Sequence, residues 1–333
     1  MNMIPRNYIM LAGSVVLGAL FGFFSWYQLS LRPINLNSAE SKTYVLKKGV
    51  GVEQLSRELK TKKLIRSAPA FNIYVTLHGL RSRLQAGSYE FAANESTREI
   101  AKKIAEGRVA VNRAVFPEGT TIIKMKQILG DKGINPADFD AALGQPYTYD
   151  FLASKPAEVS LEGYLFPDSY DLIKPVQAKL LVAEMLENFG AKIKESKVTD
   201  GWAAQGLNLH QGLTLASIVE REVHQEEDRP MVAQLYLNRL KRGMPLQADP
   251  TAAYAGELIG KKQLDVGIDS PYNTYKVNSL PPGPICNPGI SAMRAVANPK
   301  PNDYLYFISG KDGKNHFAKT LAEHEQNIAK YLK

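Results

Sequence analysis

One acidic side chain stands where proton transfer is chemically reasonable. Glu220 follows the almost wholly apolar run from Leu213 to Val219, a pattern that predicts a helix buried on most of its faces. Burial disfavours the charged form of a carboxyl group and so raises its pKa. A glutamic acid that stays protonated near neutral pH is able to donate a proton to a glycosidic oxygen. The residues alone leave a second interpretation open, in which Glu220 is a helix-surface carboxylate paired with Arg221 or Lys241.

The spacing does not place a second carboxyl group on the face of Glu220. Glu222 lies about 200° further around the helix, at about 100° per residue, so the two side chains do not share a face. The acids that the fold would have to bring near Glu220 are Glu162, Asp168 and Asp249. Hydrolysis of a glycosidic bond ordinarily needs two carboxyl groups at a set separation, whereas an internal transfer needs only one.

Polar loops follow the helical part of the chain. From Gly243 onward the sequence is rich in Pro, Gly, Asn and Tyr, which is the composition of loops that shape a cleft. Amides, hydroxyls and tyrosine rings on rigid loops suit sugar binding, because a sugar offers both hydrogen-bonding groups and flat apolar faces. The predicted substrate-binding residues in these loops are Gln247, Asp249, Tyr272 and Asn273.

Other kinds of catalytic site fit the sequence poorly. The five histidines are scattered and no His-Glu-x-x-His run occurs, so a metal site around His224 is disfavoured. Cys286 lies in a loop rich in Pro and Gly with no histidine near it in sequence, and Ser217 lacks the Gly-x-Ser-x-Gly setting of an activated serine. We therefore expect neither a metal ion nor a cofactor.

Several elements must position these side chains. Asp228 predicts the start of a helix, and Gly243 predicts its end. Further along the chain, residues 304–309 predict a buried strand and residues 321–332 a closing helix.

A strand, a tight turn and an amphipathic helix recur three times nearer the N-terminus. Each unit has an apolar residue three places before a Gly or Asn, and further apolar residues six and ten places after it. Gly and Asn tolerate a left-handed backbone, and the two later positions share one helical face. The sequence therefore predicts small α+β modules packed side by side. The turns are Leu46–Gly49, Phe91–Asn94 and Phe116–Gly119, and the paired positions are Leu55 and Leu59, Ile100 and Ile104, and Met125 and Leu129.

The N-terminus predicts a membrane anchor. Residues 7–31 carry no formal charge, and a helix of that length spans about 37 Å, against about 30 Å of hydrocarbon in a bilayer. Trp26 and Tyr27 fall where an interfacial aromatic belt lies. A cleaved signal peptide would end in small residues, whereas this segment ends in bulky ones, so we expect an uncleaved single-pass helix. Positive charges follow the helix more densely than they precede it, which by the positive-inside rule favours a cytoplasmic main body.

Composition narrows the range of partners. The 333 residues carry a net charge of +8, which suits an anionic polymer or a membrane surface, although a basic solvated surface explains it equally well. No dense Lys/Arg stripe with interleaved aromatics occurs, so we do not expect nucleic acid as a partner. Apolar residues make up 44% of the chain, enough for a large core, and the single cysteine excludes an internal disulfide.

The predicted fold class is α+β. We expect a short tail over residues 1–6, a transmembrane anchor over 7–31 and a linker over 32–41. Small α+β modules should occupy residues 42–140. A mixed α/β catalytic domain should occupy residues 141–333, with a helix that carries the catalytic glutamate and a loop-rich substrate cleft.

Six motifs follow one another along the chain: Glu162–Asp168, Leu215–Glu220, Asn238–Leu240, Gln247–Thr251, Tyr272–Tyr275 and Leu280–Ile285. Their order and wording together resemble the YceG-like family. Ala248 stands where that family often has Ser or Thr, and Val223 where Thr is common, so the finer substrate contacts are open. The opening of the first module, Tyr44–Gly49, is similar to LysM domains, which bind peptidoglycan and chitin, although a generic β-α unit explains it as well.

The resemblance implies an endolytic murein transglycosylase. Glu220 would protonate the oxygen that leaves the β-1,4 bond between N-acetylmuramic acid and N-acetylglucosamine, then take the proton of the muramyl 6-hydroxyl. That hydroxyl attacks internally and leaves a 1,6-anhydro end. The resemblance also implies termination of nascent strands, cell-wall synthases as partners, and an inner-membrane protein whose catalytic domain lies in the periplasm, against the charge bias noted above. A peptidoglycan-binding scaffold without activity and a lysozyme-type hydrolase are the alternatives.

Overall fold

The structure is a computed structural model that describes residues 6–109, 112–172 and 176–332, with the backbone alone for residues 6–13 and 112. The chain forms two compact units. The first consists of Met1–Asn112 and Asp171–Pro175, and the second of Arg113–Tyr170 and Val176–Lys333. The boundary predicted at residues 140/141 lies inside the second unit, because the third strand-turn-helix module packs there. Its Thr120 pairs in antiparallel fashion with Asn287.

The first unit is a small α+β module. Strand β1 (Ser41–Leu46) pairs antiparallel with β2 (Gly87–Ala92), so that Tyr44 lies opposite Tyr89. Between and after these strands lie α2 (Val52–Thr61), α3 (Ala68–Leu77) and α4 (Thr97–Ala105). Their apolar faces enclose one core in which Leu55, Phe71 and Ile100 are fully buried. The similarity to LysM domains remains a prediction.

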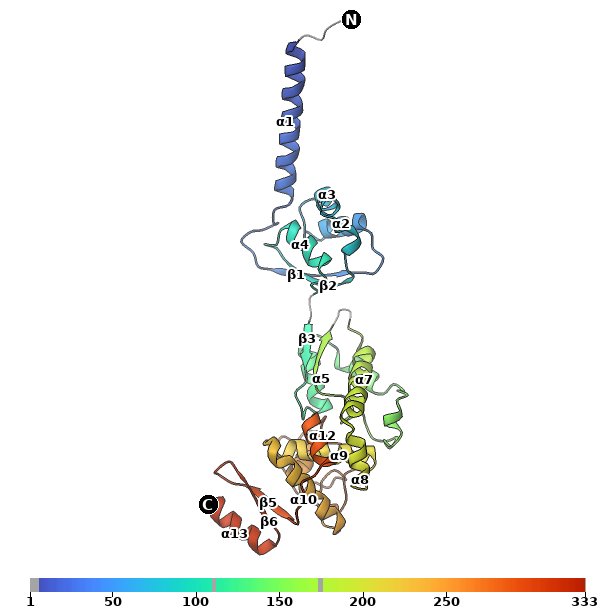
Figure 1. Cartoon of the computed structure of the whole chain (residues 1–333), viewed down its shortest axis with the longest axis vertical. Coiled ribbons are helices and arrows are strands. Elements are labelled where there is room, and N and C mark those ends of the chain that lie inside the picture. Colours follow the sequence, from blue (N-terminus) through green and yellow to red (C-terminus); the bar gives the residue numbers. More distant parts are fainter. Residues whose placement is uncertain (1–5, 110–111, 173–175, 333) are drawn as a thin grey trace. The chain divides into compact units, whose positions relative to one another are not determined.

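Helix α1 (Arg6–Ser30) occupies the segment predicted to be a membrane anchor (Figure 1). Within the described part of the chain, no helix combines the length and the apolar character needed to cross a membrane. The side chains of residues 7–13, the first part of the predicted span, lie outside the described residues.

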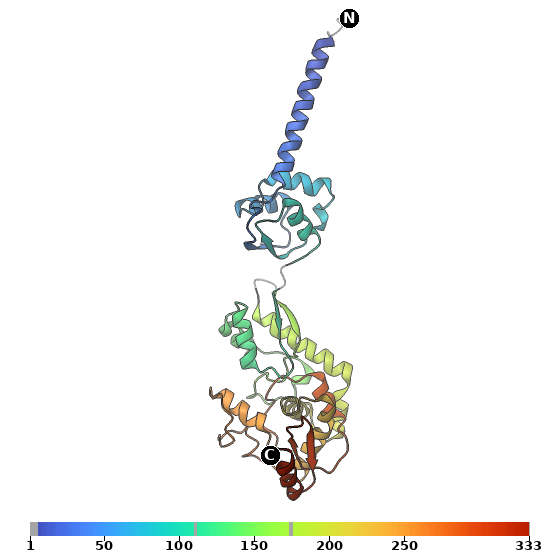
Figure 2. The ribbon, with the colours of Figure 1, turned by 90° about the vertical axis from the view of Figure 1, so that its left-hand side faces the viewer.

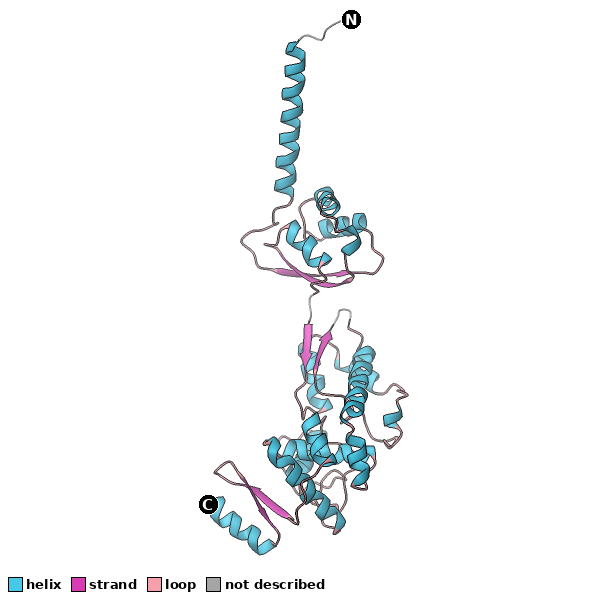
Figure 3. Cartoon of the chain, viewed as in Figure 1, coloured by secondary structure: helices cyan, strands magenta, loops and turns pink. Residues whose placement is uncertain are grey.

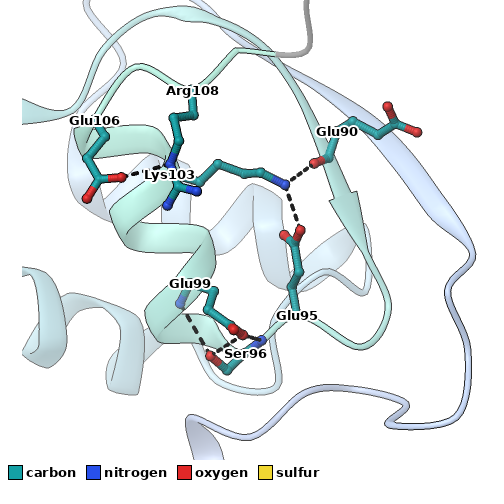
Figure 4. Close-up of polar contacts among 7 residues, drawn as sticks. All are labelled: Glu90, Glu95, Ser96, Glu99, Lys103, Glu106 and Arg108. Atoms are coloured by element: carbon teal, nitrogen blue, oxygen red, sulfur yellow. Dashed lines mark hydrogen bonds and ion pairs between the residues drawn. The ribbon is translucent and has the colours of Figure 1, made fainter.

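Polar contacts fix both ends of α4 (Figure 4). Ser96 and Glu99 form a capping box, since the Ser96 hydroxyl accepts from the Glu99 amide and the Glu99 carboxylate accepts from the Ser96 amide at 2.7 Å. Such caps contribute about 1 kcal/mol. Further along the helix, Lys103 Nζ donates to Glu95 at 2.6 Å and to the Glu90 carbonyl at 2.8 Å. Lys103 therefore ties the C-terminal part of α4 to strand β2 and to Glu95 in the turn before the helix.

The three predicted strand-turn-helix units are confirmed. Each turn is preceded by a strand, β1, β2 or β3 (Asn112–Val115), and followed by a helix, α2, α4 or α5 (Ile122–Asp131). All six paired helical positions are fully buried. Gly49 and Gly119 adopt the predicted left-handed backbone, with φ of 87° and 78°. For Asn94 the same expectation was wrong, because it is not among the described residues of positive φ, so that turn closes without a left-handed residue there.

The second unit is mostly helical, with two short two-stranded sheets, as Figures 2 and 3 show. The mixed α+β class is therefore confirmed. The elements in chain order are β3 (Asn112–Val115), α5 (Ile122–Asp131), α6 (Pro136–Leu143), β4 (Ser169–Leu172), α7 (Ala178–Ser196), α8 (Val198–Ala204), α9 (Leu209–Glu222), α10 (Arg229–Lys241), α11 (Asp249–Leu258), α12 (Ile290–Ala297), β5 (Tyr306–Ser309), β6 (Asn315–Ala318) and α13 (Leu321–Tyr331).

Helix α9 is the structural centre of this unit, since α8, α10, α11 and α12 all pack against it. A capping box between Asn208 and Gln211 starts the helix. At the residue after Gln211, a Cβ on Gly212 would lie 2.3 Å from the indole of the fully buried Trp202, so only glycine allows this close packing. The apolar run before Glu220 is buried as predicted.

The C-terminal segment differs in one respect from its prediction. The strand exists as β5, but its side chains are partly exposed and not buried. The reason is that, among the described residues, β5 pairs with β6 alone and is covered on one side by α13. The hairpin and α13 lie beside α10 at one edge of the unit (Figure 1). Asp228 precedes α10 as predicted, yet its carboxylate accepts a hydrogen bond from Asn315 of β6 and does not cap the helix.

Candidate active site

Glu220 is held by two strong contacts inside the second unit. Its Oε1 accepts a hydrogen bond from Arg229 Nη2 at 2.7 Å, and its Oε2 accepts one from the Gly289 amide at 2.9 Å. Only 5% of the Glu220 side chain and 6% of the Arg229 side chain is exposed. The guanidinium also donates to the Val223 carbonyl at the end of α9. This buried ion pair therefore joins α9, α10 and the start of α12.

Glu118, an acid that the sequence did not single out, lies close enough to Glu220 to feel its charge. Glu118, in the turn before α5, packs so closely on Gly289 that an added Cβ there would lie 1.9 Å from its carboxyl carbon. Burial, followed by the negative charge of Glu220, raises the pKa of Glu118. The sequence of Phe116–Gly119 indicated only a tight turn before a helix. Nothing in the sequence around Glu118 indicated that its carboxyl group would lie near Glu220.

Glu222 lies on a different face of α9 and borders a cavity of about 490 Å³. Burial, followed by the charge of Asp249, raises the pKa of Glu222 to about 7, although a hydrogen bond from the Tyr236 hydroxyl and the charge of Arg239 lower it in part. Its Oε2 is buried without a hydrogen-bond partner. Glu222 therefore has what a proton donor needs near neutral pH, namely a free oxygen and a suitable pKa.

Two predicted substrate-binding residues, Gln247 and Asp249, border the same cavity. Asp249 Oδ1 accepts a hydrogen bond from the Tyr275 hydroxyl at 2.6 Å. The amide oxygen of Gln247 accepts from Arg239 Nη1 at 3.3 Å. The cavity thus brings these two loop residues together with Glu222, and not with Glu220.

The backbone of Gln247 is strained, with φ at 50°, in the left-handed region that glycine prefers. Arg239 fixes this turn, because its Nη1 also donates to the Pro245 and Leu246 carbonyls at 3.1 and 2.8 Å. On the other side, the Gln247 amide donates to the Thr274 carbonyl. Strained residues held by their surroundings are typical of ligand sites.

The other two predicted binding residues do not border this cavity. Asn273 is fully buried, and its amide donates to the Val266 and Ile268 carbonyls at 2.9 and 2.7 Å. Its oxygen accepts from the Tyr275 amide. Tyr272 packs edge-on against Tyr254. The contacts of Asn273 are those of a residue that shapes the loop and leaves no group for a ligand.

The motifs that resemble the YceG-like family contact one another in the fold. The hydroxyls of Thr251, in the first turn of α11, and of Thr274, in a loop, are 2.8 Å apart, and both residues are buried. Behind α9, the Ser217 hydroxyl accepts from the Ile285 amide at 3.0 Å. The adjacent Cys286 is fully buried, and burial raises the pKa of its thiol, so it is not a nucleophile.

Two of the acids that were considered as partners of Glu220 have other contacts. Glu162 accepts hydrogen bonds from the Ile122 amide, which opens α5, and from Asn287 Nδ2 at 2.7 Å. Burial raises the pKa of Glu162 to about 8. Asp168 is exposed and accepts from Asn188. Over the described residues, no cluster of three or more His, Cys, Asp or Glu side chains is arranged to hold a metal ion.

A cleft with one free carboxyl group, amides and tyrosines defines a class of site, one suited to acid/base chemistry on a carbohydrate. The chain belongs to the YceG-like family, whose model matches residues 44–330.

The chain is also similar to two named proteins and to one solved structure. The chain is 32% identical over 335 residues to the endolytic murein transglycosylase of Bacillus subtilis (strain 168), covering 93% of this chain and 90% of that protein. It is 29% identical to the endolytic murein transglycosylase of Streptococcus pneumoniae (strain D39), of which it spans 62%. Among solved structures, a yceG-like protein from Listeria monocytogenes superimposes with a TM-score of 0.57 at 34% identity, covering 87% of this chain and 99% of that one.

Proposed function

We propose that this chain is an endolytic murein transglycosylase. It cleaves the β-1,4 bond between N-acetylmuramic acid and N-acetylglucosamine inside glycan strands and leaves 1,6-anhydro-muramyl ends. Membership of the YceG-like family and the names of two relatives support the general activity. The observation that carries the proposal is the free Glu222 oxygen beside the loop residues Gln247 and Asp249.

Glu222 is the acid/base in this proposal, and Glu220, the residue that the sequence favours, is the alternative. The carboxylic acid of Glu222 donates its proton to the oxygen that leaves with the N-acetylglucosamine. Its carboxylate then accepts the proton of the muramyl 6-hydroxyl as that oxygen bonds to the anomeric carbon. One proton is given and one is regained, so no water is consumed. A pKa of about 7 suits both halves of this cycle.

Contacts around Glu220 argue against the same cycle there. As an acid it would have to give up a buried ion pair with Arg229, and a buried guanidinium left alone is costly. As a base it would have to reach a substrate although both of its oxygens are already hydrogen-bonded. We assign it the role of holding α9 against α10.

Asp249 bears on the choice between transglycosylase and hydrolase. A hydrolase needs a second carboxyl group that serves as base or nucleophile. Asp249 is the acid beside Glu222, but one of its oxygens accepts from Tyr275 at 2.6 Å, and its charge raises the pKa of Glu222. We propose that Asp249 keeps Glu222 protonated and does not attack the sugar.

The setting in the cell is part of the proposal. Peptidoglycan lies outside the cytoplasmic membrane, so we propose an inner-membrane protein whose second unit works in the periplasm, near cell-wall synthases, where it terminates nascent strands. The uncharged segment 7–31 supports an anchor. Protease treatment of spheroplasts tests it: degradation of the second unit in intact spheroplasts is expected, and full protection would contradict it.

Product analysis tests the activity. The purified full chain is incubated with isolated peptidoglycan, beside its Glu222→Gln variant, and the released fragments are identified by mass spectrometry. We expect anhydro-muramyl ends from the wild type and none from the variant. Reducing ends would indicate a hydrolase with Asp249 as second acid, and binding without cleavage would indicate a scaffold.

A further inference from the structure

The cavity beside Glu222 has two unlike walls. One wall comes from α9, α10 and the loop before α11 and carries the polar side chains of Glu222, Arg239 and Gln247 next to two leucines. The opposite wall comes from the last 30 or so residues of the chain, and most of its side chains are aromatic or apolar. The residues of this second wall are Tyr306, Phe307, Ile308, Ser309, Leu321, His324 and Leu332.

The segment that builds the second wall contributes little to the core. Helix α13 has no buried residue among those described, and Leu321 and Leu332 are 54% and 40% exposed. The segment is tied to α10 mainly by polar contacts, because Asn238 Nδ2 donates to the Tyr304 carbonyl at 3.2 Å and Arg239 Nε to the Leu305 carbonyl at 2.6 Å. A helix held in this way at the rim of a cavity is explained better by what it offers the cavity than by packing.

Two residues that border this one cavity each carry a buried polar atom without a hydrogen-bond partner. The atoms are Oε2 of Glu222 and Nδ1 of His324. They come from opposite walls, one from α9 and the other from α13. Leaving a buried polar atom unpaired is unfavourable, and such atoms in a native fold call for an explanation. A ligand between the walls would satisfy both.

The ring of His324 is positioned for such a contact. It stacks on the ring of Tyr306, with centroids 5.2 Å apart and an angle of 27° between the planes. Tyr306 in turn lies under the Arg239 guanidinium at 5.2 Å. Burial, and then the charge of Arg239, lowers the pKa of His324. A neutral imidazole carries one donor and one acceptor nitrogen, which matches the hydroxyl and acetamido groups of an amino sugar.

We propose that His324 is a substrate-binding residue that hydrogen-bonds a glycan sugar through Nδ1 from the wall opposite Glu222. This inference rests on the proposed function and adds a specific contact to it. The C-terminal hairpin and α13 thus form one side of the glycan cleft, with Tyr306 and Phe307 as the flat surface against which the sugar lies.

The test measures strand binding in a chain that does not cleave. The Glu222→Gln full chain is titrated with purified, peptide-free peptidoglycan glycan strands. A His324→Phe substitution in that background keeps a flat ring on Tyr306 and removes both nitrogens, and we expect a rise in Kd of about tenfold. His324→Asn places an amide near the position of Nδ1, and we expect it to restore Kd to within about threefold.

His316 supplies the matched control. It lies on the same segment and stacks on Tyr331 with centroids 3.4 Å apart, but it does not border the cavity. His316→Phe in the same background should leave Kd unchanged. Thermal unfolding by circular dichroism shows that each variant is folded.

The outcomes separate the two proposals. Equal strand affinity with and without His324→Phe overturns the role of His324 and leaves the activity standing. A His316→Phe effect as large as that of His324→Phe overturns it too, because the loss would then come from the segment as a whole. Failure of the Glu222→Gln chain to bind strands at all contradicts the proposed function, and the role of His324 with it. Strand binding without cleavage by the wild type removes the activity only.

Discussion

Two glutamates on one helix, Glu220 and Glu222, show how different two environments can be within two residues. Glu220 has both oxygens hydrogen-bonded, by Arg229 and by the Gly289 amide, and only 5% of its side chain is exposed. Glu222 has an oxygen without a partner and borders a cavity. Burial alone does not make a catalytic acid. What distinguishes the two residues is whether the neighbours already use the carboxyl group.

The contrast also separates stability from function. A buried ion pair whose partners satisfy each other tends to matter for the fold, because breaking it leaves a buried charge. A buried acid with an unused oxygen costs stability and is kept where a ligand uses it. We therefore expect substitutions at the two positions to have different kinds of effect.

The largest expected effect is on catalysis at Glu222. Glu222→Gln keeps the size of the side chain and removes the titratable proton, so kcat should fall by about 10²–10⁴-fold with little change in KM. Steady-state release of anhydro-muramyl ends measures both parameters. A kcat within about threefold of the wild type would refute the assignment.

Glu220→Gln should act on stability instead. It leaves the Arg229 guanidinium buried without its carboxylate, which costs about 3–5 kcal/mol. Urea unfolding followed by circular dichroism gives this free energy. The control is Glu257→Gln, which breaks the more exposed ion pair with Arg221 and should cost about 1 kcal/mol or less. Equal losses in the two variants would remove the distinction that we draw.

Glu222 should also make the stability and the activity depend on pH. The pKa of Glu222 is raised from 4.5 to about 7 in the fold, so the folded state binds this proton more tightly than the unfolded state. The associated stability is complete below about pH 4.5 and is lost as the pH rises through about 7. The wild type should therefore lose Tm relative to Glu222→Gln between about pH 5 and pH 8. In parallel, kcat/KM should fall about tenfold per unit above pH 7.

A smaller effect is expected at Asn273, which resembles Glu220 in having its polar atoms used by the protein. Asn273→Ala removes two donated hydrogen bonds to buried carbonyls and should cost about 2 kcal/mol of unfolding free energy. The folded fraction should keep its KM for glycan strands. A raised KM at unchanged stability would restore Asn273 to the substrate-binding set.

The smallest effect is expected at Gln247, which resembles Glu222 in facing the cavity. Gln247→Gly relieves the left-handed backbone at φ 50° and should change the unfolding free energy by about 1 kcal/mol or less, while KM rises a few-fold. Gln247→Ala keeps the strain and loses the amide, so it separates the two contributions. An unchanged KM in both variants would exclude Gln247 from the binding set.

Local patterns in the sequence predicted the modules and the central helix correctly. Leu55, Ile100 and Met125 fall at the same step of three similar units, and all three are buried because a repeated apolar offset fixes a helical face. The helix before Glu220 was equally clear. The backbone of Asn94 was predicted wrongly, because a residue type that tolerates the left-handed conformation is not forced to adopt it.

The site was harder to predict because it depends on contacts that are distant in sequence. The apolar run before Glu220 indicates burial, but it does not show that Arg229 and Gly289 already occupy the carboxylate. The useful signal was the offset of about 200° that placed Glu222 on another face. Only the fold shows that Tyr236 and Gln247 border the same cavity as Glu222. It also shows that His324, which lies close to the C-terminal end of the sequence, borders this cavity.

The most direct test compares the two glutamates at equal folded fraction. The rate of anhydro-end release from isolated peptidoglycan is measured for Glu220→Gln and Glu222→Gln at a temperature at which circular dichroism shows both to be folded. The account predicts that Glu220→Gln keeps at least about a third of the wild-type rate and Glu222→Gln less than about 1%. A folded but inactive Glu220→Gln beside an active Glu222→Gln would contradict it and make Glu220 the acid.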